Sequence, residues 1–322
     1  QAPPMMNKLS RFLFASIAVA ALAGCSAEKN GESPSAPATK TILVTGATGT
    51  QGGAVARELL QRGYDVRGLT RNPDSERARV LADLGVTMVK GDYEDAPSLA
   101  AAMDGAYGVF AVTDWGEHGT DREITHGRQL IDAALRAGVS HFVFTSVAEA
   151  ESGTGIPHFD SKYEIEKFLY DSGLRWSIVR PVEFMNNIHF SKDRILGGIL
   201  ADPRDPDRRH QWIAARDIGF FVGEMFDKPE QWLGQAINIA GDEMTIGEYA
   251  DLLAECLGVD VQYRQMGWEE FEAALGDEMT QMYRWFDSPG YKVDVRALRA
   301  KYPNLTTMED YLNGLGWHAA SQ

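Results

Sequence analysis

The chain has 322 residues, of which 44% are hydrophobic and 24% are charged, enough for one large α/β domain or a domain with a smaller lobe. Its net charge of −15 argues against a nucleic-acid partner, because a negative surface repels phosphates. Cys25 and Cys256 do not make a disulfide framework, and no Cys-x-x-Cys or His-x-x-x-His pair indicates a metal site.

Residues 1–25 predict a lipoprotein signal peptide. Lys8 and Arg11 precede an apolar run over 12–23, which as a helix would span only about 18 Å, too short for a bilayer. The run ends in Leu-Ala-Gly-Cys25, which resembles the lipobox of bacterial lipoproteins. We therefore expect lipidation of Cys25 and an anchor on the periplasmic side of a bacterial envelope, or a cytoplasmic protein if the leader does not function.

Residues 26–40 have too little apolar surface to fold, which predicts a flexible linker. From residue 41 the pattern alternates between strands and helices, which predicts a doubly wound parallel sheet, the Rossmann type of α/β fold, with a smaller C-terminal α/β lobe. We expect a NAD(P)-binding domain over 41–182, to which a strand near 236–240 returns, and a substrate or partner lobe over 183–322. The expected strands are 41–46, 65–70, 86–90, 106–112, 140–146 and 175–180, and the expected helices are 53–62, 75–84, 96–103, 121–137, 160–172, 215–227 and 245–257.

A glycine-rich turn follows the first of these strands. Gly46, Gly49 and Gly52 stand three residues apart, ahead of a helical pattern. Such a turn leaves backbone amides free at the positive end of a helix, where a diphosphate binds without side-chain charge. The candidate cofactor-binding residues are Gly46, Thr48, Gly49, Thr50, Gln51 and Gly52.

The end of the second strand bears on the choice of cofactor. Enzymes that select NAD usually place an acidic residue there for the ribose 2′-hydroxyl, but this chain has Arg71, followed by Asn72. A guanidinium suits a 2′-phosphate. The sequence therefore favours NADP over NAD, although no second positive charge is evident nearby.

Further candidates follow the third and fourth strands. Asp92 and Tyr93 can meet an adenine edge, while Thr113 and Asp114 stand where ribose and nicotinamide are expected. Ligands of open α/β sheets bind outside the carboxyl ends of the strands, which favours these positions over mid-strand ones.

Several motifs from about residue 41 to the C-terminus resemble those of the NmrA-like family (HSCARG type), atypical relatives of the short-chain dehydrogenases. They are Gly46-Ala-Thr-Gly-Thr-Gln-Gly-Gly53, Thr70-Arg-Asn-Pro73, Gly91-Asp92, Pro157-His-Phe-Asp-Ser-Lys162 and Met282-Tyr-Arg-Trp-Phe286. The resemblance implies an NADP-binding Rossmann domain with a small C-terminal lobe. It also implies that Lys162 contacts the nicotinamide ribose and that Phe184 to Asn187 line the nicotinamide.

The catalytic residues are less clear. Carbonyl-reducing short-chain dehydrogenases place a Tyr four residues before the Lys, but His158 stands four before Lys162. A Tyr163–Lys167 pair occurs one residue later; a shift of one residue turns a helix by about 100°, so only one pair can face the crevice, and the family pattern favours Lys162. His158 is either a proton donor or a hydrogen-bonded loop residue, and Ser146 is a candidate partner of a substrate carbonyl.

Three functions stay open at this level. The first is an NADPH-dependent reductase of a quinone-like or other small hydride acceptor, which can take its proton from solvent. The second is a non-catalytic sensor of NADP(H) levels with a protein partner or as a homodimer. The third is a scaffold lipoprotein that has lost the cofactor. An exported protein would also have to obtain NADPH outside the cytoplasm, and the sequence does not say how.

Overall fold

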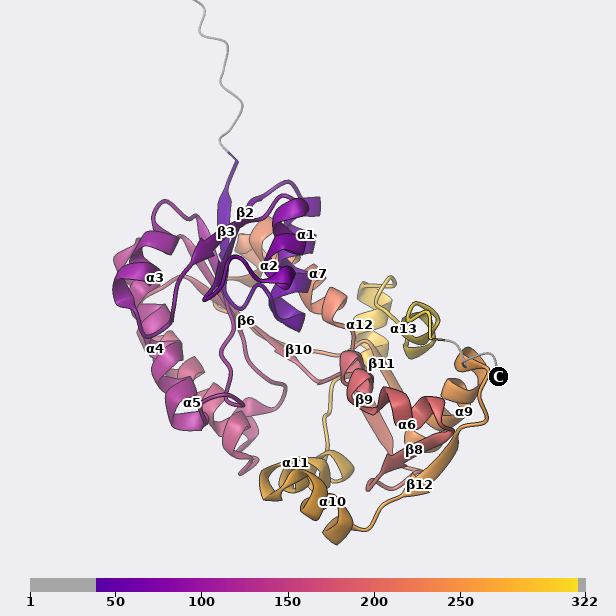
Figure 1. The fold of residues 1–322 in the computed structure, drawn as a ribbon. Coiled ribbons are helices and arrows are strands. Elements are labelled where there is room, and N and C mark those ends of the chain that lie inside the picture. Colours follow the sequence, from indigo (N-terminus) through magenta and orange to yellow (C-terminus); the bar gives the residue numbers. More distant parts are fainter. Residues whose placement is uncertain (1–38, 318–322) are drawn as a thin grey trace, which may run out of the picture. The chain divides into compact units, whose positions relative to one another are not determined.

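The computed structural model describes residues 39–317 (Figure 1). A seven-stranded sheet forms its centre, with strand order β10-β6-β5-β4-β1-β2-β3 and parallel pairing throughout. The order reverses between β1 (Thr41–Val44) and β4 (Gly108–Ala111), which creates a crevice at their carboxyl ends. The predicted Rossmann-type fold is confirmed.

The other strands of this sheet are β2 (Asp65–Thr70), β3 (Thr87–Lys90), β5 (His141–Thr145), β6 (Trp176–Pro181) and β10 (Ala236–Ile239). Its helices are α1 (Thr50–Gln61), α2 (Glu76–Asp83), α3 (Ala96–Met103), α4 (Thr120–Arg136), α5 (Pro157–Asp171), α7 (Ala215–Asp227) and α8 (Pro229–Trp232).

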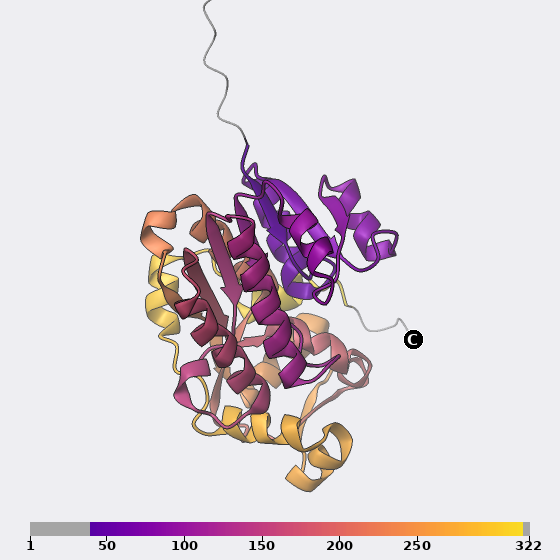
Figure 2. The same ribbon diagram turned by 90° about the vertical axis from the view of Figure 1, so that its left-hand side faces the viewer.

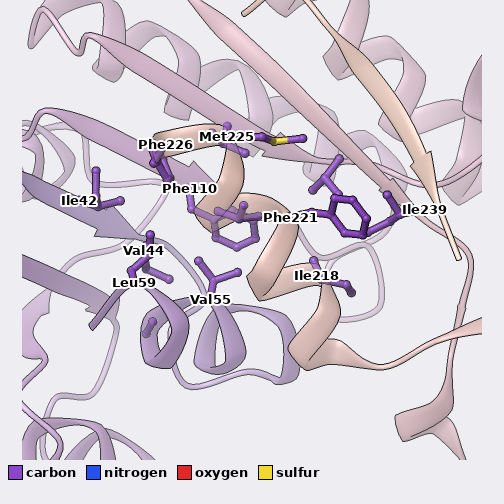
Figure 3. Packing of buried hydrophobic residues seen from close by; sticks show 14 of the residues in the cluster. Ile42, Val44, Val55, Leu59, Phe110, Ile218, Phe221, Met225, Phe226 and Ile239 are labelled. Carbon is purple, nitrogen blue, oxygen red and sulfur yellow. The ribbon is translucent and has the colours of Figure 1, made fainter. Parts of the chain in front are cut away.

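The sheet is buried on both faces, because its side chains alternate between two apolar clusters. On one face, Ile42 and Val44 pack with Phe110 and with Val55 of α1 and Phe221 of α7 (Figure 3). On the other face, β-strand residues such as Leu43 pack against α3, α4 and α5. Figure 2 shows α4 and α5 side by side across that second face.

The lobe is built from segments after residue 182 and contains two small sheets. One has the order β11-β9-β7 and the other pairs β12 with β8. These strands are β7 (Glu183–Phe184), β8 (Ile199–Asp202), β9 (Arg209–Ile213), β11 (Asp242–Thr245) and β12 (Gln262–Gln265). Its helices are α6 (Lys192–Leu196), α9 (Ile246–Leu257), α10 (Trp268–Leu275), α11 (Asp277–Asp287), α12 (Val295–Lys301) and α13 (Met308–Asn313).

Two predicted helix starts were wrong by three residues. The first helix begins at Thr50 rather than 53, because a glycine in the first turn does not prevent helical backbone and Gly52 is held there by packing. The helix predicted at 160–172 begins at Pro157, whose fixed φ suits a first helical position. His158 and Lys162 therefore lie one turn apart on the same face of α5.

Among residues 39–317, no helix is long and apolar enough to cross a membrane. The same residues contain no group of three or more His, Cys, Asp or Glu side chains placed to hold a metal ion.

Candidate functional site

One cavity of about 2710 Å³ runs from the carboxyl ends of the strands into the lobe. A pocket for one small ligand is typically about 300–1,000 Å³, so this cavity has room for a dinucleotide and a second molecule. All the candidate cofactor-binding and catalytic residues proposed from the sequence line it: Gly46, Thr48, Gly49, Thr50, Gln51, Gly52, Arg71, Asn72, Asp92, Tyr93, Thr113, Asp114, Ser146, His158, Lys162, Phe184 and Asn187.

The glycine-rich turn is shaped for a backbone that comes close to a ligand. Gly46 has a φ of +56°, which favours glycine, and a Cβ at Gly52 would stand 2.2 Å from the Gly46 carbonyl oxygen. Gly49 caps α1 with no side-chain hydrogen bond, so no side chain takes up the amides at the positive end of the helix. This cradle fits the diphosphate of a dinucleotide.

Arg71 stands at the end of β2 on the rim of the cavity, where the sequence places a 2′-phosphate. Its two terminal nitrogens each donate to a carboxylate oxygen of Glu117, at 2.8 Å. The guanidinium lowers the pKa of that carboxyl through this hydrogen-bonded pair. Arg77 of α2 also lines the cavity, and it supplies a second positive charge that the sequence did not reveal.

Tyr93 and Asp114, which line the cavity, both have internal hydrogen-bond partners. The Tyr93 hydroxyl donates to the Val112 carbonyl at 2.9 Å, and its ring meets the edge of His126 with centroids 5.5 Å apart. The Asp114 carboxylate accepts from the Gly116 amide at 2.8 Å. Tyr93 therefore offers a ring face rather than a free hydroxyl to a ligand.

Lys162 is held by a fully buried carboxylate. Its ammonium lies 2.7 Å from Glu123 and also donates to the Thr113 hydroxyl at 2.8 Å and carbonyl at 2.9 Å. Burial by itself would raise the pKa of Glu123, but the Lys162 charge and the hydrogen bonds outweigh it, so the pKa is lowered. Glu123 thus holds the Lys162 side chain in place, and no motif in the sequence points to Glu123.

The alternative pair lies elsewhere on the same helix. Lys167 donates to Glu164 at 2.5 Å and stands 5.3 Å from the centre of the Tyr163 ring, with neither residue among those that line the cavity.

His158 contacts the lobe rather than open solvent. Its ring stacks on Trp115 with centroids 4.4 Å apart, and its Nδ1 lies 2.7 Å from a carboxylate oxygen of Glu278 in α11. Burial lowers the pKa of His158, although Glu278 opposes the shift. A ring that is stacked on Trp115 and already bonded to a carboxylate favours a structural link between α5 and α11 over proton donation.

Ser146 follows β5 and has a hydroxyl free for a ligand. This oxygen is buried and has no hydrogen-bond partner among the described residues. A buried hydroxyl without a partner is costly unless a ligand or water completes it. Ser146 is therefore placed to bond a polar atom inside the cavity.

The lobe end of the cavity contains a buried ionic cluster that the sequence did not predict. Arg204 is 4% exposed; it donates to both carboxylate oxygens of Asp202 at 2.9 and 2.8 Å and to Glu183 at 2.8 Å. Burial raises the pKa of Glu183, whereas for Asp202 the Arg204 charge outweighs burial and lowers the pKa. The rings around this cluster belong to Trp212, Tyr283 and Phe286.

Cys25 and the predicted leader lie outside the described residues, so lipidation and an envelope location stay predictions.

The family model that describes the NmrA-like family matches residues 38–312. An NmrA-like family domain-containing oxidoreductase, notA of Aspergillus sp., is 32% identical over 269 residues, which cover 74% of this chain and 78% of the relative.

Two solved structures share the fold. The NADPH-dependent quinone oxidoreductase of Escherichia coli complexed with NADPH has a TM-score of 0.74 at 25% identity, with 85% of this chain and 99% of the other covered. The negative transcriptional regulator NmrA in complex with NADP has a TM-score of 0.70 at 22% identity, with 86% and 95% covered.

Proposed function

Because the chain belongs to the NmrA-like family, we propose that it is an NADP(H)-binding oxidoreductase that reduces a quinone-like or other small hydride acceptor. The observation that carries this proposal is the single cavity shared by the α1 amino terminus, Arg71, Lys162 and the aromatic wall of the lobe. Relatives support it, since notA is described as an oxidoreductase and the E. coli neighbour as an NADPH-dependent quinone oxidoreductase.

The cofactor would lie along the carboxyl ends of the strands. The amides at the start of α1 would hold its diphosphate, and Arg71 and Arg77 would face the 2′-phosphate that distinguishes NADP from NAD. Tyr93 would offer its ring to the adenine side. These placements support NADP as the preferred cofactor, because Arg71 and Arg77 supply positive charge where a phosphate has to sit.

At the other end, Lys162 would bond the nicotinamide ribose in place of one of its two Thr113 contacts, while Glu123 keeps its ammonium in position. Bound NADPH would supply the hydride. Ser146 would donate to an oxygen of the acceptor, and the proton would come from solvent, since no tyrosine stands four residues before Lys162.

The acceptor would lie between the nicotinamide end and the lobe. Aromatic side chains from several lobe elements line this part of the cavity: Phe184, Trp212, Tyr249, Phe271, Tyr283 and Phe286. Flat apolar walls favour a planar conjugated molecule, because offset stacking adds to the burial of apolar surface. A quinone-like acceptor has this shape and accepts a hydride.

A sensor without turnover is the second candidate. It is favoured by the state of the two side chains expected to do chemistry, since Lys162 is bound by Glu123 and His158 by Glu278. The structural neighbour NmrA is described as a transcriptional regulator in complex with NADP. A reductase and a sensor need the same cofactor cradle and differ only in turnover.

Titration of the purified protein with NADPH, followed by NADPH oxidation with a panel of quinones and dyes, separates the candidates. We expect binding and turnover, and we expect K162M to lower kcat/KM by at least about tenfold because the ribose loses its cation. K167M is the matched control, since Lys167 lies on the same helix outside the cavity. Tight binding with no turnover supports the sensor, and absence of nucleotide binding contradicts both.

A further inference from the structure

The ion pair between Arg71 and Glu117 occupies the place where the proposed cofactor site needs an open guanidinium. Both terminal nitrogens of Arg71 are bound to the two oxygens of Glu117, each at 2.8 Å. Within residues 39–317, Arg71 makes no other side-chain hydrogen bond. The carboxylate thus accepts from the two terminal nitrogens of Arg71, which a phosphate would also use.

Carboxylate and phosphate compete for these two nitrogens because each presents two oxygens to the same pair of N–H donors. A 2′-phosphate that approaches Arg71 would also meet the negative charge of Glu117 at close range. NADP(H) therefore competes with Glu117 for the two terminal nitrogens of Arg71. NAD(H) carries a 2′-hydroxyl instead, which can donate to a carboxylate and needs no displacement of Glu117.

The loop that carries Glu117 allows this displacement. It joins β4 to α4, and Glu117 has Gly116 before it and Gly119 two residues after it, the latter with a φ of +80°. The Glu117 side chain is 46% exposed and that of Arg71 60% exposed, so neither is locked by packing. Water and salt screen an exposed ion pair, so it contributes little to stability and a phosphate can displace it.

We propose that Glu117 is a specificity-determining residue of the cofactor site. Its carboxylate competes with the 2′-phosphate for Arg71. Glu117 thereby reduces the ratio of NADP(H) to NAD(H) affinity that Arg71 alone would give. This inference rests on the proposed dinucleotide site, and it adds a residue that no part of the glycine-rich motif indicates.

The test is a set of NADPH and NADH titrations, read by fluorescence, on the wild-type protein and on E117Q, R71Q and the double variant. E117Q should tighten NADPH binding by about fivefold, the affinity equivalent of one exposed ion pair, and should change NADH binding by less than about twofold in either direction. In the R71Q background, E117Q should change NADPH affinity by less than about twofold, because Glu117 acts on the phosphate through Arg71.

Glu94 provides the matched control. It also lines the cavity and its side chain is likewise 46% exposed, but it pairs with Arg122 at 3.0 Å and His126 at 3.2 Å rather than with Arg71. E94Q removes the same charge from the same rim and should leave the ratio of NADPH to NADH affinity within about twofold of wild type.

Three other outcomes of these titrations would contradict either the role of Glu117 or the proposed function. One is that E117Q leaves the ratio of NADPH to NADH affinity unchanged, or shifts it equally with and without Arg71. Either result shows that Glu117 does not compete for the phosphate, and neither contradicts the proposed cofactor site. If E94Q shifts the ratio as much as E117Q, the effect is one of general charge and the inference is overturned. If neither nucleotide binds the wild-type protein, the proposed function fails, and the inference fails with it.

Discussion

The two ends of the cavity handle charge in opposite ways. At the glycine-rich turn, backbone amides at the start of α1 supply the positive potential and the lining is built from small residues. In the lobe, the charge is on side chains, with Arg204 buried between Glu183 and Asp202. The first end depends on close backbone approach and the second on a neutralising ion cluster. The glycine-rich turn is therefore sensitive to added side-chain volume, and the lobe is sensitive to the loss of a charge.

The largest expected effect is in the lobe. R204L would leave Glu183 and Asp202 buried without their cation, so we expect the free energy of unfolding to fall by about 3–5 kcal/mol. Urea unfolding of the purified variant measures this loss.

Arg209 is the control for that experiment, because it is 53% exposed and pairs with Glu243 and Glu248 at the surface. R209A should cost less than about 1 kcal/mol. Equal losses for R204L and R209A would contradict the contrast between the two ends of the cavity.

A smaller effect is expected at the glycine-rich turn. G52A would force a Cβ to within 2.2 Å of the Gly46 carbonyl, so the turn has to move, at a cost of about 1–3 kcal/mol. We also expect NADPH affinity to fall by at least about tenfold, because the amides lose their alignment. Thermal unfolding and NADPH titration read the two effects separately.

Gly53 is the neighbouring control, since a Cβ there would stand 3.3 Å from the Ala47 carbonyl. G53A should keep both stability and affinity close to wild type, with any strain offset by the better helix propensity of alanine. A G52A protein that binds NADPH as tightly as G53A would show that the turn does not hold the diphosphate.

The smallest expected effect is a loss of stability on mild acidification, and it compares a buried histidine of the central sheet with one of the lobe. Burial lowers the pKa of His141, the first residue of β5, to about 4, and burial together with the Arg204 charge lowers that of His210, in β9 of the lobe, to about 3. The unfolded chain, with an ordinary histidine pKa of about 6.5, binds these protons first. Stability is therefore full above about pH 6.5 and falls as the pH drops towards the folded values.

At pH 5 each of the two histidines should cost at most about 2 kcal/mol relative to pH 7. Urea unfolding at both pH values measures the sum. H210Q should reduce the difference in unfolding free energy between pH 7 and pH 5 to the contribution of His141. If wild type unfolds with the same free energy at both pH values, neither histidine has the lowered pKa.

The fold class and the glycine-rich turn follow from local sequence. Alternating strands and helices lead to a parallel sheet, and Gly46, Gly49 and Gly52 are spaced for a turn made mainly by contacts within the motif, to which the fold adds Val112 beside Gly46. Arg71, Asp92 and Thr113 follow strands of one parallel sheet, so their arrival at one edge also follows from local pattern.

Only the tertiary structure decided the partners of the charged side chains. Glu117 reaches Arg71 across 46 residues, Glu278 reaches His158 across 120, and Glu183 reaches Arg204 across 21. Such pairs form when the fold brings together segments that are far apart in the chain. The residues next to each partner therefore do not predict the pair. Hydrophobic periodicity and turn residues are local features, so the sequence predicts the elements that they form. The partner of a buried or rim charge is a distant side chain that the fold brings within about 3 Å, so only the structure shows it.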